Sequence, residues 1–449
     1  MKRFFYIGLF SCLLVACNPD KDIFTPNPIF SEGFVTTSIS GQILDVTSQP
    51  VEGAIITLDQ LDRTSDVNGF FYFKNVQVDA KRAILNVNKD GFFAGGRAVF
   101  PTKESNAPLK IRLLEKAVVA NFDGSAGGEV DLPDGVILDV PTDAVLSQNG
   151  TGFSEEVQVS AYSLNPESLE GLQKMPIDLK GETTSDEEKI LESFGIFLFD
   201  WSDANNQKLS IVPGKKVTIQ FPISNGVGAQ APSTLGLWYF DNADNIWKEE
   251  GTVTLQNGNY VAEVGKTGFW NIATPHDFIS VKGVLENQNA GVLSNMPFSI
   301  EIDNGGILGF GYADEDGKFN VNVPKNLASK IKVLDECNDI DYSTTIGALD
   351  IDFQISSVKI NNSSDFSHIS GTLLKCDGNK VQTGYIILSV NTKIYFFPFS
   401  EGIFKGDINA CNITSATLVA YDVENSKQSE PLQLEINAST ETGEISVCF

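Results

Sequence analysis

The residues that most often carry catalysis are sparse in this chain of 449 residues, which contains only two histidines. Neither His276 nor His368 begins a zinc-peptidase helix motif, and neither has a second histidine nearby with which to share a metal. The Gly-x-Ser-x-Gly pattern that exposes a nucleophilic serine does not occur. Gly265-Lys266-Thr267 matches the end of a phosphate-binding loop, but Tyr260 stands where the first glycine is needed. We therefore interpret both histidines as surface or linker residues and expect no catalytic residue, metal or cofactor.

Carboxylates are abundant and could do acid–base chemistry in pairs. The chain has 58 Asp and Glu residues against 32 Lys and Arg, and its formal net charge is −26 at pH 7. Two carboxylates at a set separation are enough to hydrolyse a glycosidic bond, but the sequence singles out no pair. A carboxylate-dependent hydrolase acting on glycans is therefore kept as the alternative to a non-catalytic role. The acidity argues against a nucleic-acid partner, because binding phosphates needs a clustered basic surface.

One acidic turn, Asp314-Glu315-Asp316-Gly317, has the composition of a weak calcium site. It lacks the further spaced ligands and the distal glutamate of an EF-hand loop. Acidic side chains are also common in hairpin turns, where they accept hydrogen bonds from the backbone. We interpret the segment as a turn and expect no metal there.

The four tryptophans are another candidate site, because exposed indole rings form platforms for glycans or peptides. They are Trp201, Trp238, Trp247 and Trp270. Trp238 lies in the strand-like segment Leu235-Gly236-Leu237-Trp238-Tyr239-Phe240, and large aromatic side chains dominate protein cores. We favour core packing and keep the binding platform as the alternative.

The elements that position these residues are predicted to be short strands joined by turns. The chain has 31 Phe and 39 Gly, is rich in Val and Ile, and contains no long segment at helical spacing. Two short segments, 165–173 and 185–191, are the helix candidates. We predict an all-β fold built of tandem β-sandwich modules.

A strand-turn-strand cassette occurs three times along the chain. The copies begin at Ile39-Ser40-Gly41, Val281-Lys282-Gly283 and Ile369-Ser370-Gly371, and they reach a turn at Gly69-Phe70-Phe71, Gly317-Lys318-Phe319 and Gly402-Ile403-Phe404. Glycine accepts a positive φ in a tight turn, and the aromatic residue that follows is expected on the inward face of its strand. In the first copy we therefore expect Phe70 and Phe73 to lie in the core.

The first copy resembles the carboxypeptidase regulatory-like family, which has a transthyretin-like β-sandwich. The resemblance rests on Ser40-Gly41, Pro50-Val51-Glu52-Gly53-Ala54, Asp66-Val67-Asn68-Gly69-Phe70 and Asn88-Lys89-Asp90-Gly91-Phe92. Copies two and three match more loosely. The family name describes a fold found beside peptidases, so the resemblance implies a sandwich and no peptidase activity.

The region between the first two copies has a different signature. Its segment Gly127-Gly128-Glu129-Val130-Asp131-Leu132-Pro133-Asp134-Gly135-Val136-Ile137-Leu138-Asp139-Val140-Pro141 resembles the opening of ZU5-like β-domains. The resemblance covers little beyond these residues and implies another β-rich unit.

The N-terminus has the pattern of an export signal. Lys2 and Arg3 precede an apolar run from Phe4 to Ala16 that is too short to span a membrane. The run ends in Leu14-Val15-Ala16-Cys17, which resembles the lipobox of bacterial lipoproteins; an ordinary secretory signal is the alternative. The resemblance implies cleavage before Cys17 and attachment of a diacylglyceryl group and an acyl chain such as palmitate, which together suffice for stable anchoring in the outer membrane.

The segment after Cys17 reads as a tether. Asn18-Pro19-Asp20-Lys21-Asp22 and the residues up to about Gly33 show little apolar periodicity. Acidic residues just behind a lipidated cysteine resemble the surface-export signal of Bacteroidetes lipoproteins, and a plain solvated linker is the alternative. We favour display on the cell surface.

Export makes disulfide bonds plausible among four cysteines of the C-terminal third, namely Cys337, Cys376, Cys411 and Cys448. Four cysteines allow three pairings. If strands of the third copy alternate in direction from Ile369, then Cys376 and Cys448 fall at one end of it and Cys411 at the other. Cys337 follows a strand of the second copy that ends near the third. We predict the pairs Cys376–Cys448 and Cys337–Cys411.

These observations predict six segments: a signal peptide (1–16), an acidic tether (17–35), a carboxypeptidase regulatory-like sandwich (36–117), a tryptophan-containing β-rich region (118–277), and two further sandwiches (278–361 and 362–449). We expect a lipid-anchored envelope protein that binds a glycan or protein ligand, or serves adhesion or display, without catalysis. A structural role at the envelope is a third alternative.

Overall fold

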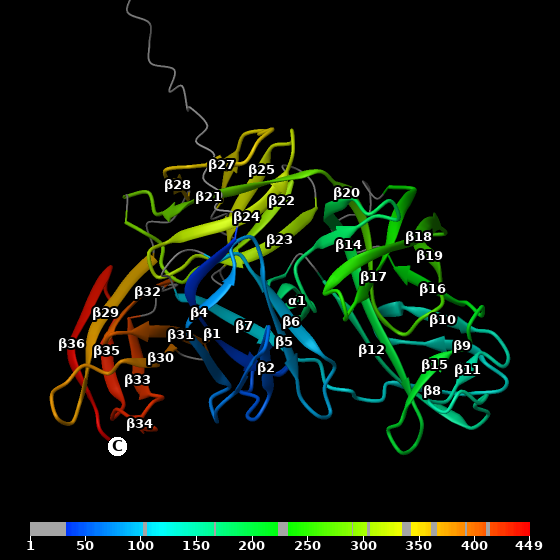
Figure 1. Ribbon diagram of the computed structural model, residues 1–449, viewed down its shortest axis with the longest axis horizontal. Coiled ribbons are helices and arrows are strands. Elements are labelled where there is room, and N and C mark those ends of the chain that lie inside the picture. The colour runs from blue at the N-terminus through cyan, green and yellow to red at the C-terminus, as the bar shows by residue number, and fades with distance from the viewer. Residues whose placement is uncertain are drawn as a thin grey trace, which may run out of the picture.

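The computed structural model describes residues 33–101, 106–165, 168–222, 232–289, 291–302, 306–334, 343–360, 366–390, 393–409 and 414–449. Within these ranges the chain is nearly all β, as predicted, with one short helix, α1 (Leu169–Lys174), and a 3-10 turn, η1 (Pro133–Gly135) (Figure 1). No helix in the described part of the chain is long and apolar enough to cross a membrane.

The helix lies in the first of the two predicted helical segments. Its N-cap is Ser168, whose side chain accepts a hydrogen bond from the backbone N–H of Gly171, and this contact satisfies one of the free donors of the first turn. The second predicted helix, at 185–191, was wrong. That segment is a turn with Asp186 at a φ of 60°, followed by the long strand β14 (Glu188–Ser202). Pairing with neighbouring strands overrides local helix propensity there.

Three parts of the chain form β-sandwiches. The strands of the first are β1 (Phe34–Leu44), β2 (Ile55–Leu58), β3 (Leu61–Thr64), β4 (Phe70–Asp79), β5 (Ala83–Asn88), β6 (Gly95–Val99) and β7 (Asn106–Arg112). The strands of the second are β21 (Phe278–Glu286), β22 (Pro297–Ile302), β23 (Ile307–Tyr312), β24 (Lys318–Pro324), β25 (Ser329–Val333), β26 (Ser343–Ile346), β27 (Phe353–Gln354) and β28 (Val358–Lys359). The strands of the third are β29 (Phe366–Lys375), β30 (Thr383–Val390), β31 (Lys393–Ser400), β32 (Ile403–Asn409), β33 (Ser415–Asp422), β34 (Lys427–Gln428), β35 (Leu432–Glu435) and β36 (Ser439–Val447).

The three sandwiches share one topology. In each, the first strand pairs antiparallel with the fourth: β1 with β4, β21 with β24 and β29 with β32. It also pairs parallel with the strand or strands at the end of the unit: β1 with β7, β21 with β27 and β28, and β29 with β36. The second strand pairs antiparallel with the third and the fifth: β2 with β3 and β5, β22 with β23 and β25, β30 with β31 and β33. The cassette seen in the sequence is therefore the opening of one repeated fold.

The two glycines of the cassette are needed for the same two reasons in all three copies. The strand glycine faces a phenylalanine of the fourth strand, and a Cβ built on Gly41, Gly283 or Gly371 would lie 2.7, 2.8 or 2.6 Å from that ring. The facing rings are Phe71, Phe319 and Phe404. The turn glycines Gly69, Gly317 and Gly402 have φ of 74°, 72° and 70°, the left-handed region that favours glycine.

The expectation for Phe70 was wrong. Phe71 and Phe73 belong to the core of the first sandwich, whereas Phe70 packs with Tyr385 and Phe396 of the third. Successive side chains of a strand point to opposite faces, so the inward residue is the second one after the turn glycine. The same is true of Phe319 and Phe404, which are buried in the other two sandwiches.

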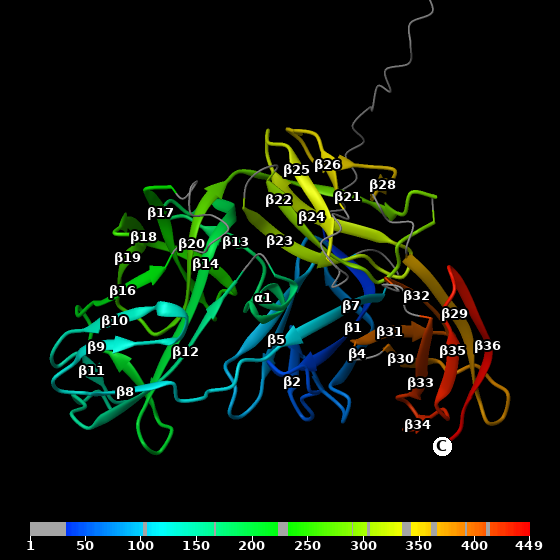
Figure 2. The same cartoon turned by 180° about the vertical axis from the view of Figure 1, so that it is seen from behind.

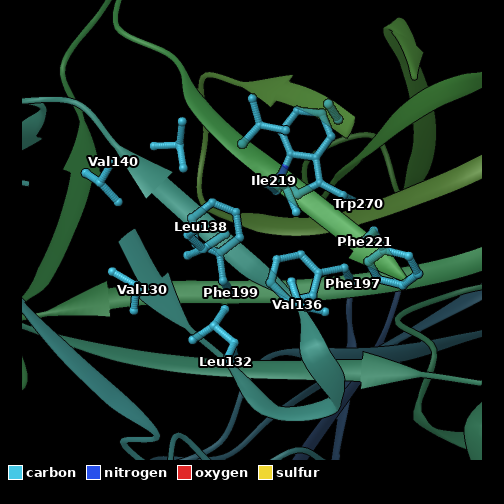
Figure 3. Close-up of a cluster of buried hydrophobic side chains, with 14 of the residues drawn as sticks. Val130, Leu132, Val136, Leu138, Val140, Phe197, Phe199, Ile219, Phe221 and Trp270 are labelled. Carbon is cyan, nitrogen blue, oxygen red and sulfur yellow. The ribbon is translucent and has the colours of Figure 1, made fainter. Parts of the chain in front are cut away.

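The middle region is a separate β-rich unit. Its strands are β8 (Ala120–Asp123), β9 (Gly128–Asp131), β10 (Ile137–Val140), β11 (Val145–Leu146), β12 (Glu156–Leu164), β13 (Lys180–Glu182), β14, β15 (Lys208–Ile211), β16 (Val217–Pro222), β17 (Thr234–Asp241), β18 (Ile246–Gln256), β19 (Asn259–Val264) and β20 (Gly268–His276). Strand β14 pairs with β12 and β20, and β9 and β10 form a hairpin through η1. Figure 3 shows apolar residues of this hairpin facing Phe197, Phe199 and Trp270.

The four units are not arranged as an extended string. In Figures 1 and 2 the middle region and the third sandwich lie at opposite ends, with the first sandwich between them and the second beside all three. Strand β14 also pairs with β23 through Ser193 and Ile307, so hydrogen bonding continues from the middle region into the second sandwich. The units are thus tandem in sequence and packed side by side in space.

Candidate functional site

All four tryptophans are buried inside the middle region. The exposed fractions are 1% for Trp201, 0% for Trp238 and Trp247, and 3% for Trp270. The indole N–H of Trp247 donates to the carbonyl of Asp178 at 3.0 Å. Because none of the rings offers a face to solvent, they act as core residues, and the platform for glycan or peptide finds no support in their positions.

The disulfide bond predicted between Cys376 and Cys448 is confirmed. Both cysteines directly follow parallel neighbouring strands, since Lys375 at the end of β29 pairs with Val447 at the end of β36, and the two Cα atoms are 5.4 Å apart. Cys337, Cys411 and the lipidation candidate Cys17 lie outside the described residues. Their pairing and modification stay predictions.

Several hydrogen-bonded polar side chains lie where the units meet, and His368 is the first example. Its Nδ1 lies 3.2 Å from Oδ1 of Asp407 on the neighbouring strand β32. The other oxygen of Asp407 accepts a hydrogen bond from the backbone N–H of Ser294, in the second sandwich. The hydrogen bond with Asp407 raises the pKa of His368 against the opposing effect of burial.

His276 makes an equivalent contact at another junction. Its Nε2 lies 2.9 Å from Oε2 of Glu192 on β14, and Oε1 of Glu192 accepts the backbone N–H of Gly306, in the second sandwich, at 2.7 Å. Burial opposes ionisation of Glu192, but these hydrogen bonds outweigh it and lower the pKa of the carboxyl group. Both histidines therefore lie at junctions between units, where their side chains are partly exposed, at 19% for His276 and 35% for His368. This agrees with their interpretation as linker residues and adds a carboxylate partner for each.

The residue types of a hydrolytic triad meet at the first of these junctions, but their geometry does not suit hydrolysis. Ser294 contacts Asp407 through its backbone N–H, and its Oγ has no hydrogen-bond partner among the described residues. Ser294 is 0% exposed, so a substrate could not reach its hydroxyl. A nucleophilic serine needs an accessible Oγ hydrogen-bonded to the histidine, so the arrangement is a structural contact.

The first and third sandwiches meet at an aromatic and polar cluster. The ring centroids of Phe70 and Tyr385 are 4.3 Å apart, and the Tyr385 hydroxyl donates to Oδ2 of Asp66 at 2.9 Å. Nδ2 of Asn68 donates to the same hydroxyl at 2.7 Å. Burial and the nearby Asp66 carboxylate raise the pKa of Tyr385.

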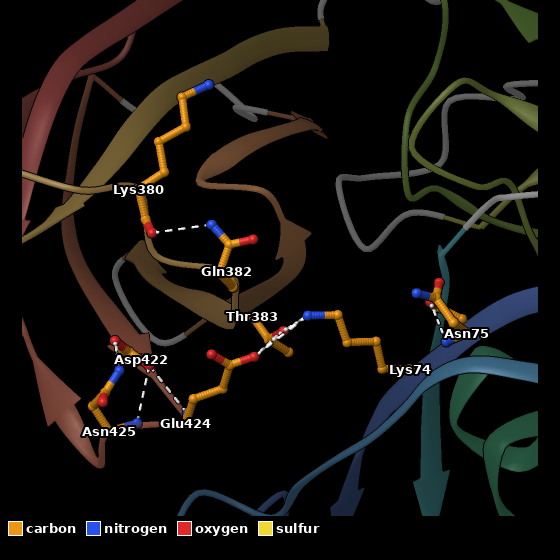
Figure 4. A network of polar contacts seen from close by, with 9 residues as sticks. Lys74, Asn75, Lys380, Gln382, Thr383, Asp422, Glu424 and Asn425 are labelled. Atoms are coloured by element: carbon orange, nitrogen blue, oxygen red, sulfur yellow. Dashed lines mark hydrogen bonds and ion pairs between the residues drawn. The ribbon is translucent and has the colours of Figure 1, made fainter.

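A second contact between the same two sandwiches lies at the surface. Figure 4 shows the Lys74 ammonium group reaching Glu424 and Thr383 of the third sandwich, at 3.4 and 3.1 Å. Surface ion pairs of this kind contribute about 1 kcal/mol or less. The aromatic cluster therefore carries most of the docking energy.

A third junction joins three units around α1. Arg97 of the first sandwich is 3% exposed and donates to the carbonyls of Leu172 and Gln173 at 3.2 and 2.9 Å. The Gln173 side chain accepts from Arg112 at 2.9 Å and donates to the Tyr312 hydroxyl of the second sandwich at 2.9 Å. One turn of helix is thus hydrogen-bonded to both sandwiches.

In the acidic turn considered for calcium, the first carboxylate accepts hydrogen bonds from the backbone of the turn itself. Oδ1 of Asp314 accepts the backbone N–H groups of Asp316 and Lys318, at 2.8 Å each. Oδ1 of Asp66 accepts the equivalent N–H groups in the first sandwich. Over the described ranges, no group of three or more His, Cys, Asp or Glu side chains is placed to hold a metal ion.

Comparisons with known proteins give little beyond the fold. No protein-family model matches the chain, and neither does any curated protein. Among solved structures, the shaft pilin SpaA from Lactobacillus rhamnosus GG is 9% identical over 38% of this chain and 98% of the pilin, with a TM-score of 0.19. The Bacillus anthracis TIE protein is 10% identical over 89% of this chain and 75% of that protein, with a TM-score of 0.18. BcpA, the major pilin subunit of Bacillus cereus, is 10% identical over 92% of this chain and 99% of the pilin, with a TM-score of 0.15. Likenesses this weak carry no argument, so the case for function depends on the chain's own residues.

Proposed function

We propose that the protein is a lipid-anchored protein of the cell envelope, displayed on the cell surface, that acts as a non-catalytic module for binding, adhesion or display. The observation that best supports this proposal is the interlocking of its four folded units. Junction residues such as Phe70, Arg97, Glu192 and Asp407 are nearly buried and contact a neighbouring unit. A body whose units are held in one arrangement presents its loops and outer faces in fixed relative positions, which favours recognition over chemistry.

The proposed anchor is lipid on Cys17, inserted in the outer membrane. The residues that follow it, up to about residue 33, give the folded body a polar tether. Several acyl chains on one cysteine provide the two or more hydrophobic signals that stable membrane attachment requires. The acidic composition of the chain keeps such a body soluble outside the membrane.

The alternative kept from the sequence, a carboxylate-dependent hydrolase acting on glycans, needs two carboxylates at a set separation and is decided by the assay below. A hydrolase that uses serine and histidine gains no support from the described residues. In the described part of the chain, both histidines are hydrogen-bonded to carboxylates inside junctions. Ser294, whose backbone N–H contacts Asp407, is inaccessible. We therefore retain binding or display as the proposal, with a glycan or a protein as the ligand class.

The test combines a glycan array with a broad hydrolase screen, both on the purified protein. We expect ligand capture without turnover. Turnover that is abolished by replacing a single carboxylate would overturn the non-catalytic proposal. Protease treatment of intact cells tests display separately, because a surface protein is digested while a periplasmic control protein is spared.

A further inference from the structure

The junction between the first and third sandwiches contains an asparagine that is followed by glycine. Asn68 and Gly69 lie in the turn before β4, and Nδ2 of Asn68 donates a hydrogen bond to the Tyr385 hydroxyl of the third sandwich at 2.7 Å. Burial raises the pKa of Tyr421, also in the third sandwich, and a hydrogen bond with Asn68 opposes this rise. The amide group of Asn68 therefore contacts two hydroxyl groups of the neighbouring unit.

An asparagine followed by glycine is prone to deamidation, because glycine has no side chain to shield its backbone nitrogen. In this reaction the nitrogen of Gly69 loses its proton and attacks Cγ of Asn68. The bond from Cγ to Nδ2 breaks, ammonia leaves, and a five-membered succinimide ring forms. Water then opens the ring to aspartate or isoaspartate. One water is consumed and one ammonia is released, with no other reactant.

Two features of the folded protein oppose this reaction. The backbone N–H of Gly69 donates to the carbonyl of Asp66 at 2.8 Å, and Gly69 is buried. The amide of Asn68 is also held by Tyr385, so Cγ cannot turn toward the attacking nitrogen without breaking that hydrogen bond. The first feature belongs to the turn itself. The second is lost whenever the third sandwich separates from the first.

We propose that Asn68 is a deamidation site which docking of the third sandwich protects, and that its conversion to aspartate weakens this docking. The Tyr385 hydroxyl has one proton, which it donates to Oδ2 of Asp66 at 2.9 Å. An amide at position 68 can donate to the oxygen of that hydroxyl, but a carboxylate cannot. A carboxylate would also place a second negative charge beside Asp66.

The equivalent turn of the second sandwich shows what a carboxylate at this position requires. Asp316 stands there before Gly317, and its Oδ1 contacts Nζ of Lys405 of the third sandwich at 2.5 Å. The side chain in each turn thus matches its partner, since a carboxylate meets an ammonium group and an amide meets hydroxyl groups. Deamidation of Asn68 would set a carboxylate against hydroxyl groups suited to an amide.

The first test measures deamidation by peptide mass spectrometry in whole protein kept at mildly alkaline pH. Asn257, which precedes Gly258 in the exposed turn between β18 and β19, is the internal reference. We expect Asn68 to convert more slowly than Asn257. The double variant Tyr385→Phe, Tyr421→Phe keeps both rings but removes both hydroxyls, and it should speed conversion of Asn68 severalfold without affecting Asn257.

Three results of this test would overturn the protection. They are equal conversion at the two sites in the wild type, an unchanged rate at Asn68 in the double variant, and a rise at both sites, which would indicate general loosening of the fold.

The second test measures docking in the converted protein. Asn68→Asp reproduces one reaction product, and Asn257→Asp makes the same charge change in the middle region as the matched control. Energy transfer between dyes on the first and third sandwiches is followed against urea concentration. We expect Asn68→Asp to lower the docking equilibrium constant about ten- to a hundredfold, because a hydrogen bond is replaced by a repulsive contact. Energy transfer should therefore be lost at a lower urea concentration than in the control.

Wild-type protein aged until Asn68 has converted gives the same measurement on a chain that folded before the change. Loss of energy transfer at the same urea concentration in aged wild type, Asn68→Asp and Asn257→Asp would overturn the proposed effect on docking.

Discussion

The placement of Phe70 outside its own sandwich leads to a sharp prediction. Phe70 and Phe73 are both nearly inaccessible in the whole protein, at 2% and 0% exposure. Phe73 is covered by the first sandwich itself, whereas Phe70 is covered by Tyr385 and Phe396 of the third. Replacing either ring by alanine therefore removes a similarly buried side chain. For Phe73 the lost contacts lie inside the first sandwich, and for Phe70 they lie between the first and third sandwiches.

The magnitudes follow from which neighbours are present. Truncating a buried phenylalanine to alanine costs about 3–5 kcal/mol. In a separately expressed first sandwich, Phe73→Ala should cost that amount, and Phe70→Ala should cost only a few tenths, within the roughly ±0.5 kcal/mol of a surface substitution. In the whole protein, Phe70→Ala should instead lower the equilibrium constant for docking of the third sandwich, by roughly two to four orders of magnitude if the full burial is lost.

Two assays check these expectations. Urea unfolding of the isolated sandwich gives the free energies of unfolding of the two variants, and energy transfer between dyes on the first and third sandwiches reports docking in the whole protein. Equal losses for Phe70→Ala and Phe73→Ala in the isolated sandwich would refute the assignment of strand faces. Unchanged energy transfer in the Phe70→Ala protein would refute the role of this ring in docking.

Three further predictions follow from the other contacts. The pKa of His368 is raised in the folded state by its hydrogen bond with Asp407, so the pair should stabilise the protein fully below about pH 6.5 and lose this effect as the pH rises through the raised pKa of His368. Thermal melts from pH 5 to 9 should show the melting temperature falling over that range, and His368→Gln should remove this part of the fall. The disulfide between Cys376 and Cys448 closes a loop of 72 residues, and replacing both cysteines by serine should cost about 4 kcal/mol by loop entropy, measured by urea unfolding with reduced wild type as the control. Cys17→Ser should abolish fatty-acid labelling and release the protein from membranes, and a mutant that stayed membrane-bound without label would contradict the anchor.

The repeated fold could be predicted from the sequence because its signals are local. Gly41 is required by the ring of Phe71 on the adjacent strand, and Gly69 by a tight turn with positive φ. Both constraints lie within one sandwich and recur in the other two copies. The bond between Cys376 and Cys448, which are 72 residues apart, followed from counting strands, because both cysteines belong to one copy of the repeated fold.

The junctions could not be predicted in this way, because their partners belong to different units, whose relative placement no repeat or strand count indicates. Asn68 and Tyr385 are 317 residues apart, and Arg97 and Leu172 are 75 apart. Nothing near Arg97 or His368 in the sequence indicates a buried partner. Without such a partner a charged side chain is expected at the surface, so the burial of Arg97 could not be predicted from its neighbours in the sequence.

One signal for a junction was nevertheless present in the repeat. The residue directly after the turn glycine points outward in all three copies, and it is Phe70, Lys318 and Ile403 in turn. The Lys318 side chain is 47% exposed and Ile403 is 51% exposed, but Phe70 is 2% exposed. An aromatic residue at an outward position would leave a large apolar ring in water unless another surface covers it. Comparing equivalent positions between the three copies therefore indicates that Phe70 is a docking residue, because it is the aromatic one of the three outward residues. In the structure the third sandwich covers this ring.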